Sequence, residues 1–339
     1  MFYRIKKTYR DIIHRYLGDW RYFLYDVVKH EKKILRTYYD DSRKYSLPSK
    51  TAIYMANGFC GHAGLADRFK GMTALYGLCK EAGIEFKIYH IYPFDLCDYL
   101  MPNEYEWRIS AEQVCYNKKL VSVNYFMLHP LVQKQIDSGE IFDLERNWVL
   151  ERIAKSPNNQ LHFYTNMYPK SERVFGEYFR YLFKPTPKVE EKLQFHLHQI
   201  GCPFISVSYR FMQLLGDFKD CEGITLSSGQ QDCLIKQSLD VLQYIKDTNP
   251  EFRKILVTSD SMKFLNATKS LPFVYVIEGE VGHINFTCSD DVNMKTFLDF
   301  FMIAHADKVF LAKSEKMYNS EFSRRAAMIY NKEFELVIY

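Results

Sequence analysis

Polar residues follow two apolar runs in the second half of the sequence, where they could bind a phosphorylated ligand. Arg210 follows the run at 204–209, and an arginine there can hold a phosphate through two parallel hydrogen bonds. Thr258 and Asp260 end the run that begins at Ile255, and their oxygen atoms can accept hydrogen bonds from a ribose or a base. A surface salt bridge for Arg210 and a helix-capping role for Asp260 explain the same residues equally well.

A third polar cluster is the segment S-E-F-S-R-R-A-A at 320–327, which has the composition of a helix start. Ser320 can cap this helix. Alternatively, Ser323 and the first-turn N–H groups can bind a phosphate, because those groups lack partners within the helix and its dipole favours negative charge. Both interpretations stay open.

The segment at 51–80 predicts a strand over 51–56, a glycine-bearing loop and then an amphipathic helix. Gly58, Gly61 and Gly64 let the backbone approach an anion without an intervening Cβ atom. Many strand–loop–helix units bind nothing, so the loop by itself favours neither interpretation.

Length and composition indicate a folded two-domain protein. The chain has 339 residues, of which 47% are hydrophobic and 25% charged. Its eight cysteines show no metal-binding spacing, which predicts reduced thiols and a cytoplasmic location. No apolar run reaches the roughly 20 residues of a membrane-spanning helix.

The basic charge is concentrated at the beginning of the chain. Residues 1–50 contain 13 Lys and Arg against 6 Asp and Glu, whereas the whole chain has a net charge of +4. The periodicity over 3–45 predicts a basic amphipathic helix. This helix can lie on an anionic membrane, such as the inner face of the cytoplasmic membrane, or pack on the body of the protein. Nucleic acid is not an expected partner, since the body has no basic groove.

Several common enzyme sites are absent from the sequence. The glycine spacing G-x-x-G-x-x-G, and a second strand that ends in His90 and Ile91 without an acidic residue, argue against a nicotinamide dehydrogenase. His196 and His198 diverge on a helix, and the Asp290–Asp291 pair is expected in a solvated loop. We therefore expect no metal and no cofactor.

Strands and helices alternate from residue 51 to the end of the chain. Such alternation predicts parallel sheets with helices on both faces and a ligand at the carboxyl ends of the strands. We expect a basic helical segment at 1–48, a Rossmann-like domain at 49–200 and a second Rossmann-like domain at 201–339. Two such domains facing each other would place the site between them.

Four motifs occur together in a particular order. They are G-x-A-G-L-A-D-R-F-K-G at 61–71, the strand with its arginine at 204–210, V-T-S-D at 257–260 and S-E-F-S-R-R-A-A at 320–327. This ordered set resembles the superfamily of α1,2-, α1,6- and protein O-fucosyltransferases, and more closely its bacterial members.

The resemblance implies a GT-B-like α/β fold and an inverting, metal-independent fucosyltransferase that uses GDP-fucose. It implies that the domain at 49–200 is the acceptor-side domain and that the domain at 201–339 binds the nucleotide sugar. It implies transfer to a glycan, such as a bacterial surface polysaccharide or its lipid-linked precursor. Arg210 would assist departure of GDP, with Asp67 and Asp217 as candidates for the general base. The implied donor-binding residues are Gly61, Gly64, Arg68, Ser208, Thr258, Asp260, Ser320, Phe322 and Ser323.

One position departs from the family pattern. The family's strand motif is usually His-x-Arg, and this chain has Ser208 in place of the histidine. A serine can replace a hydrogen bond to a phosphate but not a positive charge. The alternatives are therefore a non-catalytic nucleotide- or sugar-binding relative, a glycosyltransferase with another donor, and a scaffold that acts through its basic helix.

Overall fold

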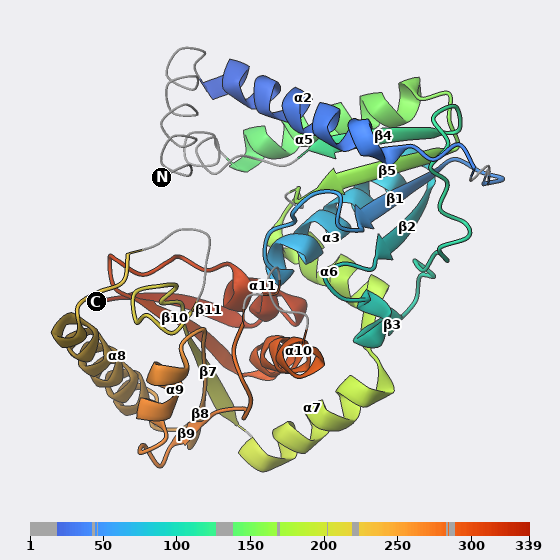
Figure 1. Cartoon of the computed structure of the whole chain (residues 1–339). Coiled ribbons are helices and arrows are strands. Elements are labelled where there is room, and N and C mark those ends of the chain that lie inside the picture. Colours follow the sequence, from blue (N-terminus) through green and yellow to red (C-terminus); the bar gives the residue numbers. More distant parts are fainter. Residues whose placement is uncertain are drawn as a thin grey trace. The chain divides into compact units, whose positions relative to one another are not determined.

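The computed structural model describes residues 19–42, 45, 47–126, 138–167, 170–201, 203–218, 224–282, 284 and 289–339 (Figure 1). The chain forms two compact units. The first comprises the described residues of Met1–Ala63, Asp67–Tyr92 and Tyr105–Ser171, and the second those of Gly64–Ala66, Pro93–Glu104 and Glu172–Tyr339.

The first unit contains a four-stranded parallel sheet in the order β2-β1-β5-β4. Its strands are β1 (Thr51–Ala56), β2 (Glu85–His90), β4 (Val121–Phe126) and β5 (Gln160–Thr165). All residues of β1 and β5 are buried. This burial on both faces is typical of central strands in a parallel sheet covered by helices.

The helices of the first unit are α2 (Asp19–Tyr38), α3 (Leu65–Ala82) and α5 (Ser138–Lys155). Glycine is required on α3 at Gly71, where an added Cβ atom would lie 2.5 Å from the carbonyl oxygen of Thr165. The helix that follows the glycine loop therefore packs directly against the end of β5. It was expected to be amphipathic, but it is buried on nearly all sides, including Arg68 and Lys70, because partners within the fold satisfy these two cations.

The second unit contains a five-stranded parallel sheet in the order β11-β10-β7-β8-β9. Its strands are β7 (Phe204–Tyr209), β8 (Lys254–Ser259), β9 (Val274–Tyr275), β10 (Lys308–Lys313) and β11 (Glu333–Ile338). The predicted alternation and the parallel sheets are confirmed. A small antiparallel pair joins β3 (Leu100–Pro102) to β6 (Phe183–Pro185), and η1 (Leu96–Asp98) is a single 3-10 turn.

Helices cover both faces of the second sheet (Figure 1). On one face Val207 of β7 and Val257 of β8 join a core with Leu242 and Phe264, which belong to α8 and α9. On the other face α10 contacts β8 and α11 contacts β10. The helices of this unit are α6 (Glu172–Leu182), α7 (Pro187–Ile200), α8 (Ser228–Thr248), α9 (Met262–Thr268), α10 (Asp290–His305) and α11 (Phe322–Ile329).

The acidic pair Asp290–Asp291 corrects a sequence expectation. It was expected in a loop, but it forms the first turn of α10. Carboxylates are favourable at a helix N-terminus. Oδ1 of Asp290 accepts a hydrogen bond of 2.6 Å from the Tyr99 hydroxyl, and Oδ2 lies 2.8 Å from Nζ of Lys188. Local periodicity could not predict these two contacts, because Tyr99 and Lys188 are distant from Asp290 in the sequence.

The contacts of α6 and α7 place them in the second unit, although both were expected in the first domain. In α6, an added Cβ atom at Gly176 would lie 2.0 Å from the carbonyl oxygen of Met328 in α11. α7 contacts α10. The limits 1–48, 49–200 and 201–339 were predicted together with a role for each domain, and this assignment stays a prediction.

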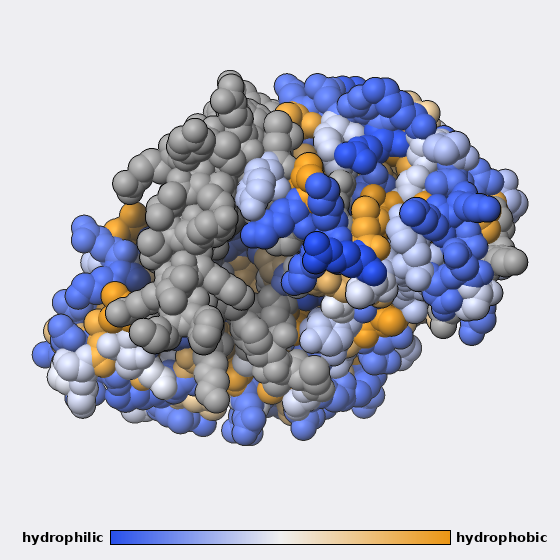
Figure 2. Space-filling model, turned by 45° about the horizontal axis from the view of Figure 1, so that its top comes forward, coloured by the Kyte–Doolittle hydropathy of each residue, from blue (hydrophilic) through white to orange (hydrophobic). Residues whose placement is uncertain are grey.

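The predicted basic helix corresponds in part to α2, whereas residues 3–18, 43 and 44 of the prediction lie outside the described part of the chain. Ile34 and Tyr38 of α2 are buried, and the helix contacts β4. None of the described helices has the length and apolar character needed to span a membrane. The face drawn in Figure 2 is largely hydrophilic, with small separate hydrophobic patches, as on most folded proteins.

Candidate functional site

Arg210 is the first residue after β7, at the carboxyl edge of the second sheet. Its Nη1 lies 3.1 Å from Oδ2 of Asp260, and its guanidinium carbon lies 4.6 Å from the centre of the Phe218 ring. The Arg210 side chain is 22% exposed. Two partners thus hold the guanidinium group in place while part of it stays accessible.

Asp260 organises the turn that carries Arg210. Its Oδ1 accepts a 2.9 Å hydrogen bond from the N–H of Phe211, and its Oδ2 accepts one of 2.7 Å from the N–H of Met212. Met212 has a φ of 55°, a left-handed conformation that is uncommon for a residue with a side chain. Burial raises the pKa of Asp260, while Arg210 and the two N–H groups act in the opposite direction.

Asp217 joins the same loop to α9. Its Oδ2 accepts hydrogen bonds of 2.9 Å from the Ser261 hydroxyl and 2.7 Å from the N–H of Lys263. The Ser261 hydroxyl in turn accepts from the N–H of Phe264 and caps α9. The loop after β7 is therefore fixed to the start of α9 by two carboxylates, those of Asp217 and Asp260.

Ser208 and Thr258 are neighbours in the register of β7 and β8. Their hydroxyl oxygens lie 2.8 Å apart, and both residues are buried. This pairing explains how a serine fits at the position where the family pattern has a histidine. The small Ser208 side chain forms a hydrogen bond with the Thr258 hydroxyl on the adjacent strand, while both residues keep their places in the sheet.

The loop before α11 lies beside the turn after β7. The N–H of Tyr318 donates a 3.2 Å hydrogen bond to the carbonyl oxygen of Arg210. Ser320 accepts a 3.3 Å hydrogen bond from the N–H of Phe322. The residue at the cap position of α11 is Glu321, one residue later than the capping serine expected from the sequence.

Ser323 is fully buried in the first turn of α11, and its hydroxyl oxygen has no hydrogen-bond partner among the residues that the structure describes. The Phe322 ring packs against Phe300 of α10 at a centroid distance of 5.1 Å. Of the residues predicted for the donor, the structure thus brings together those that follow β7, β8 and β10. Their strands are neighbours in one sheet.

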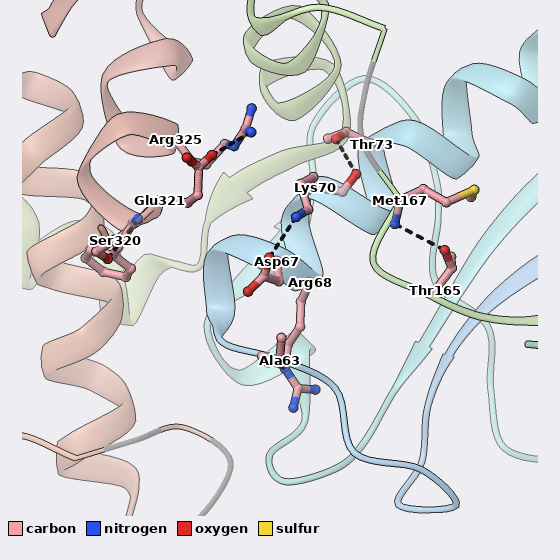
Figure 3. A network of polar contacts seen from close by, with 11 residues as sticks. Ala63, Asp67, Arg68, Lys70, Thr73, Thr165, Met167, Ser320, Glu321 and Arg325 are labelled. Carbon is pink, nitrogen blue, oxygen red and sulfur yellow. Dashed lines mark hydrogen bonds and ion pairs between the residues drawn. The ribbon is translucent and has the colours of Figure 1, made fainter. Parts of the chain in front are cut away.

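The predicted residues of the glycine loop have partners within the first unit. Oδ1 of Asp67 lies 2.8 Å from Nζ of the buried Lys70, a pair that Figure 3 shows on α3. Arg68 is 2% exposed, and its Nε donates a 3.1 Å hydrogen bond to the carbonyl oxygen of Ala63. Figure 3 also shows the Glu321–Arg325 ion pair of α11, whose nearest atoms are 2.6 Å apart.

Gly61 and Gly64 lie in open surroundings, because a Cβ atom at either position would meet no described heavy atom within 4 Å. Their backbone is therefore accessible to a ligand, as the sequence analysis expected of such a loop. No steric contact within the described structure requires glycine at these two positions.

A buried polar network behind the glycine loop was not predicted. The Asn57 side chain accepts a 2.8 Å hydrogen bond from the Tyr164 hydroxyl and donates one of 3.1 Å to the Tyr116 hydroxyl. The Tyr54 hydroxyl lies 3.2 Å from Nδ1 of His62. Burial, together with nearby Arg68, lowers the pKa of His62 and keeps the imidazole neutral.

Sequence reasoning also missed Phe218 and Tyr318 as partners of Arg210. Both are aromatic residues in loops, where no periodicity marks their role. Across the described ranges, no group of three or more His, Cys, Asp and Glu side chains could hold a metal ion.

No family model matches the sequence. No curated protein matches it either. Solved structures do share the fold. One is the NodZ α-1,6-fucosyltransferase soaked with GDP-fucose, with 13% identity and a TM-score of 0.54, covering 83% of this chain and 92% of that one. The same enzyme from Bradyrhizobium gives 14% identity and a TM-score of 0.53 in a further structure with the same coverage.

Two other solved structures agree. A mutant FUT1 of Arabidopsis thaliana in complex with GDP has 11% identity and a TM-score of 0.52, covering 98% of this chain and 78% of that one. POFUT1 in complex with GDP has 12% identity and a TM-score of 0.50, covering 86% and 99%. The chain therefore has the GT-B-like α/β fold that the motifs implied.

Proposed function

We propose that this protein is an inverting, metal-independent glycosyltransferase that transfers fucose from GDP-fucose to a hydroxyl group of a glycan. The fold supports this proposal, because the proteins that share it are fucosyltransferases solved with GDP-fucose or GDP. The observation that carries it is Arg210, a partly exposed guanidinium group fixed at the carboxyl end of a central strand.

The chemistry assigned to Arg210 follows from its geometry. Cleavage of the sugar–phosphate bond builds negative charge on the departing diphosphate. A preorganised cation stabilises that charge without rearranging at the moment of reaction. Asp260 and Phe218 supply this preorganisation, because they contact one edge and one face of the guanidinium group and hold it at the end of β7.

The first turn of α11 is the second part of the proposed donor site. Its N–H groups are not satisfied within the helix, and the helix dipole favours an anion there. Ser323 belongs to the same turn, and in this proposal its hydroxyl, which is buried and unpartnered among the described residues, becomes accessible to the phosphate when the donor binds. In this proposal Arg210 and α11 together provide the positive potential, and Ser320 and Phe322 shape the loop around the donor.

The proposal also covers the general base and the acceptor. In an inverting reaction the acceptor hydroxyl attacks on the side opposite GDP, and a carboxylate removes its proton. Asp67 and Asp217 are the candidates, one paired with Lys70 and one fixed at α9. We propose a glycan of a bacterial surface polysaccharide as the acceptor. Gly61, Gly64 and Arg68 are proposed to bind the donor.

The alternative is a protein that binds a nucleotide sugar without transferring it. The Ser208–Thr258 hydroxyl pair favours this alternative, because it places two neutral groups where the family pattern has a histidine. Donor binding would then persist while transfer is absent.

The first test is thermal stability in the presence of GDP, GDP-fucose, GDP-mannose, UDP and NAD, each with and without Mg²⁺ or EDTA. We expect GDP and GDP-fucose to raise the melting temperature, since a ligand of the folded state stabilises it by mass action. The rise should be the same in Mg²⁺ and in EDTA. Stabilisation by UDP alone would contradict the proposed donor, and a rise that requires Mg²⁺ would contradict the metal-independent mechanism.

We also propose that the protein binds the inner face of the cytoplasmic membrane through α2, near a lipid-linked acceptor. One face of α2 exposes three cations and two apolar residues, a combination suited to anionic headgroups. These residues are Tyr25, Val28, Lys29, Lys32 and Arg36.

Vesicle flotation tests this membrane proposal. Phosphatidylglycerol-rich vesicles should carry the protein upward at low salt, and phosphatidylcholine vesicles should not. Replacing Lys29, Lys32 and Arg36 with glutamate should weaken binding by about a hundredfold or more, because each cation near an anionic surface contributes about 1 kcal/mol and 1.4 kcal/mol corresponds to a factor of ten. The matched control replaces three exposed lysines of the second unit, Lys192, Lys236 and Lys269. Equal loss in both triple variants would contradict a role for α2.

A further inference from the structure

An aromatic residue projects from the carboxyl end of the first sheet. Tyr92 lies two residues after β2 and is 49% exposed, and its neighbour Ile91 is 45% exposed. In open parallel sheets, ligands bind outside the carboxyl ends of the strands. Tyr244, another exposed aromatic residue, lies on α8 and away from such an edge.

The backbone of Tyr92 is held from two directions. Its N–H donates a 3.0 Å hydrogen bond to the carbonyl oxygen of Ala56, the last residue of β1. Its carbonyl oxygen accepts a 3.3 Å hydrogen bond from Nη1 of Arg68. A nearly buried guanidinium group thus helps to fix the backbone of an exposed residue. Burial of a charged group costs free energy, so a nearly buried arginine that holds the backbone of Tyr92 indicates an ordered segment and not a solvated loop.

The Tyr92 ring also has a fixed position. Gly58 packs against it, because a Cβ atom at Gly58 would lie between 3.4 and 3.7 Å from three ring carbons. Gly58 has a φ of 90°, a backbone conformation that residues with a side chain rarely adopt. One face of the ring therefore contacts the loop after β1. A ring ordered before binding loses little entropy when it receives a ligand on its other face.

We propose that Tyr92 stacks against a pyranose ring of the acceptor glycan, with the side chain of Ile91 extending the apolar contact. The C–H groups on one face of a pyranose carry partial positive charge and complement the negative face of an aromatic ring. This inference rests on the proposed function only in identifying the bound sugar as part of the acceptor. The stacking itself requires only that the protein binds a sugar ring at this edge of the sheet.

The experiment measures binding of fluorescently labelled oligosaccharides of glucose, galactose, mannose and N-acetylglucosamine by anisotropy. The proteins are the wild type and the variants Tyr92→Ala, Tyr92→Leu and Tyr92→Phe, with Tyr244→Ala as the matched control. For the tightest oligosaccharide we expect Tyr92→Ala and Tyr92→Leu to weaken binding by about tenfold, Tyr92→Phe to stay within about twofold and Tyr244→Ala to equal the wild type. The leucine variant separates stacking from general apolar contact.

Two further measurements separate this inference from the proposed function. Stabilisation by GDP reports on the donor site alone and should be unchanged in every Tyr92 variant. With GDP-fucose and the best oligosaccharide as substrates, Tyr92→Ala should raise the acceptor KM by about tenfold and change kcat by less than about twofold.

Equal oligosaccharide binding by the wild type and Tyr92→Ala would overturn the inference, as would a wild type that binds GDP but none of the oligosaccharides. If GDP does not bind and oligosaccharide binding still depends on the Tyr92 ring, the inference stands and the proposed transfer reaction fails.

Discussion

Replacing Arg210 with lysine is expected to lower kcat for sugar transfer by about a hundredfold to a thousandfold, the range seen when one preorganised donor to a developing charge is removed. Lysine keeps the positive charge but lacks the planar fork of donors that can contact Asp260 and a phosphate at the same time. It also loses the flat stacking on Phe218. The measurement is GDP release from GDP-fucose with and without acceptor.

A surface arginine on an aromatic ring provides the control for Arg210→Lys. The guanidinium carbon of Arg152 lies 4.8 Å from the centre of the Trp148 ring on α5. Arg152→Lys should leave kcat unchanged within about twofold. A second variant, Asp260→Asn, should also lower kcat while the protein stays folded, because the turn at Met212 and the guanidinium group both depend on this carboxylate. Normal turnover in Arg210→Lys would remove Arg210 from the mechanism.

Replacing Gly176 with alanine is expected to lower the free energy of unfolding by about 3 kcal/mol, at the upper end of the cost of overpacking. The added methyl group would lie 2.0 Å from the carbonyl oxygen of Met328, so α6 and α11 would have to separate. Alanine raises helix propensity by about 1 kcal/mol over glycine, and the steric conflict must exceed this gain. Urea denaturation followed by circular dichroism gives the value.

The control for Gly176→Ala is Gly229→Ala in the first turn of α8, where the new methyl group meets no described heavy atom within 4 Å. This variant should be as stable as the wild type or slightly more stable. Because α11 also carries Ser323, Gly176→Ala should weaken stabilisation by GDP as well. A variant as stable as the wild type would show that the two helices do not pack as closely as described.

The alternation of strands and helices in the two parallel sheets could be predicted from the sequence alone, whereas the start of α10 and the β3–β6 pair could not. Each strand of the two parallel sheets was marked by a short apolar run, and Arg210 was placed correctly after β7 because its run, F-I-S-V-S-Y, ends there. The break between α6 and α7 followed from Pro185 and Pro187, which cannot continue a helix. These features depend on a few consecutive residues, so periodicity and proline chemistry are enough to predict them.

The contacts between polar groups that are distant in the sequence became known only from the tertiary structure. Asp260 lies 50 residues after Arg210 in the sequence, yet parallel pairing of β7 and β8 brings their ends together. Gly176 required glycine because of a helix 150 residues away, and Tyr92 was fixed by Arg68 and Gly58. Local patterns carry information about burial and backbone geometry, whereas the partners of a side chain depend on which strand ends and loops become neighbours. That choice is made by packing over the whole unit.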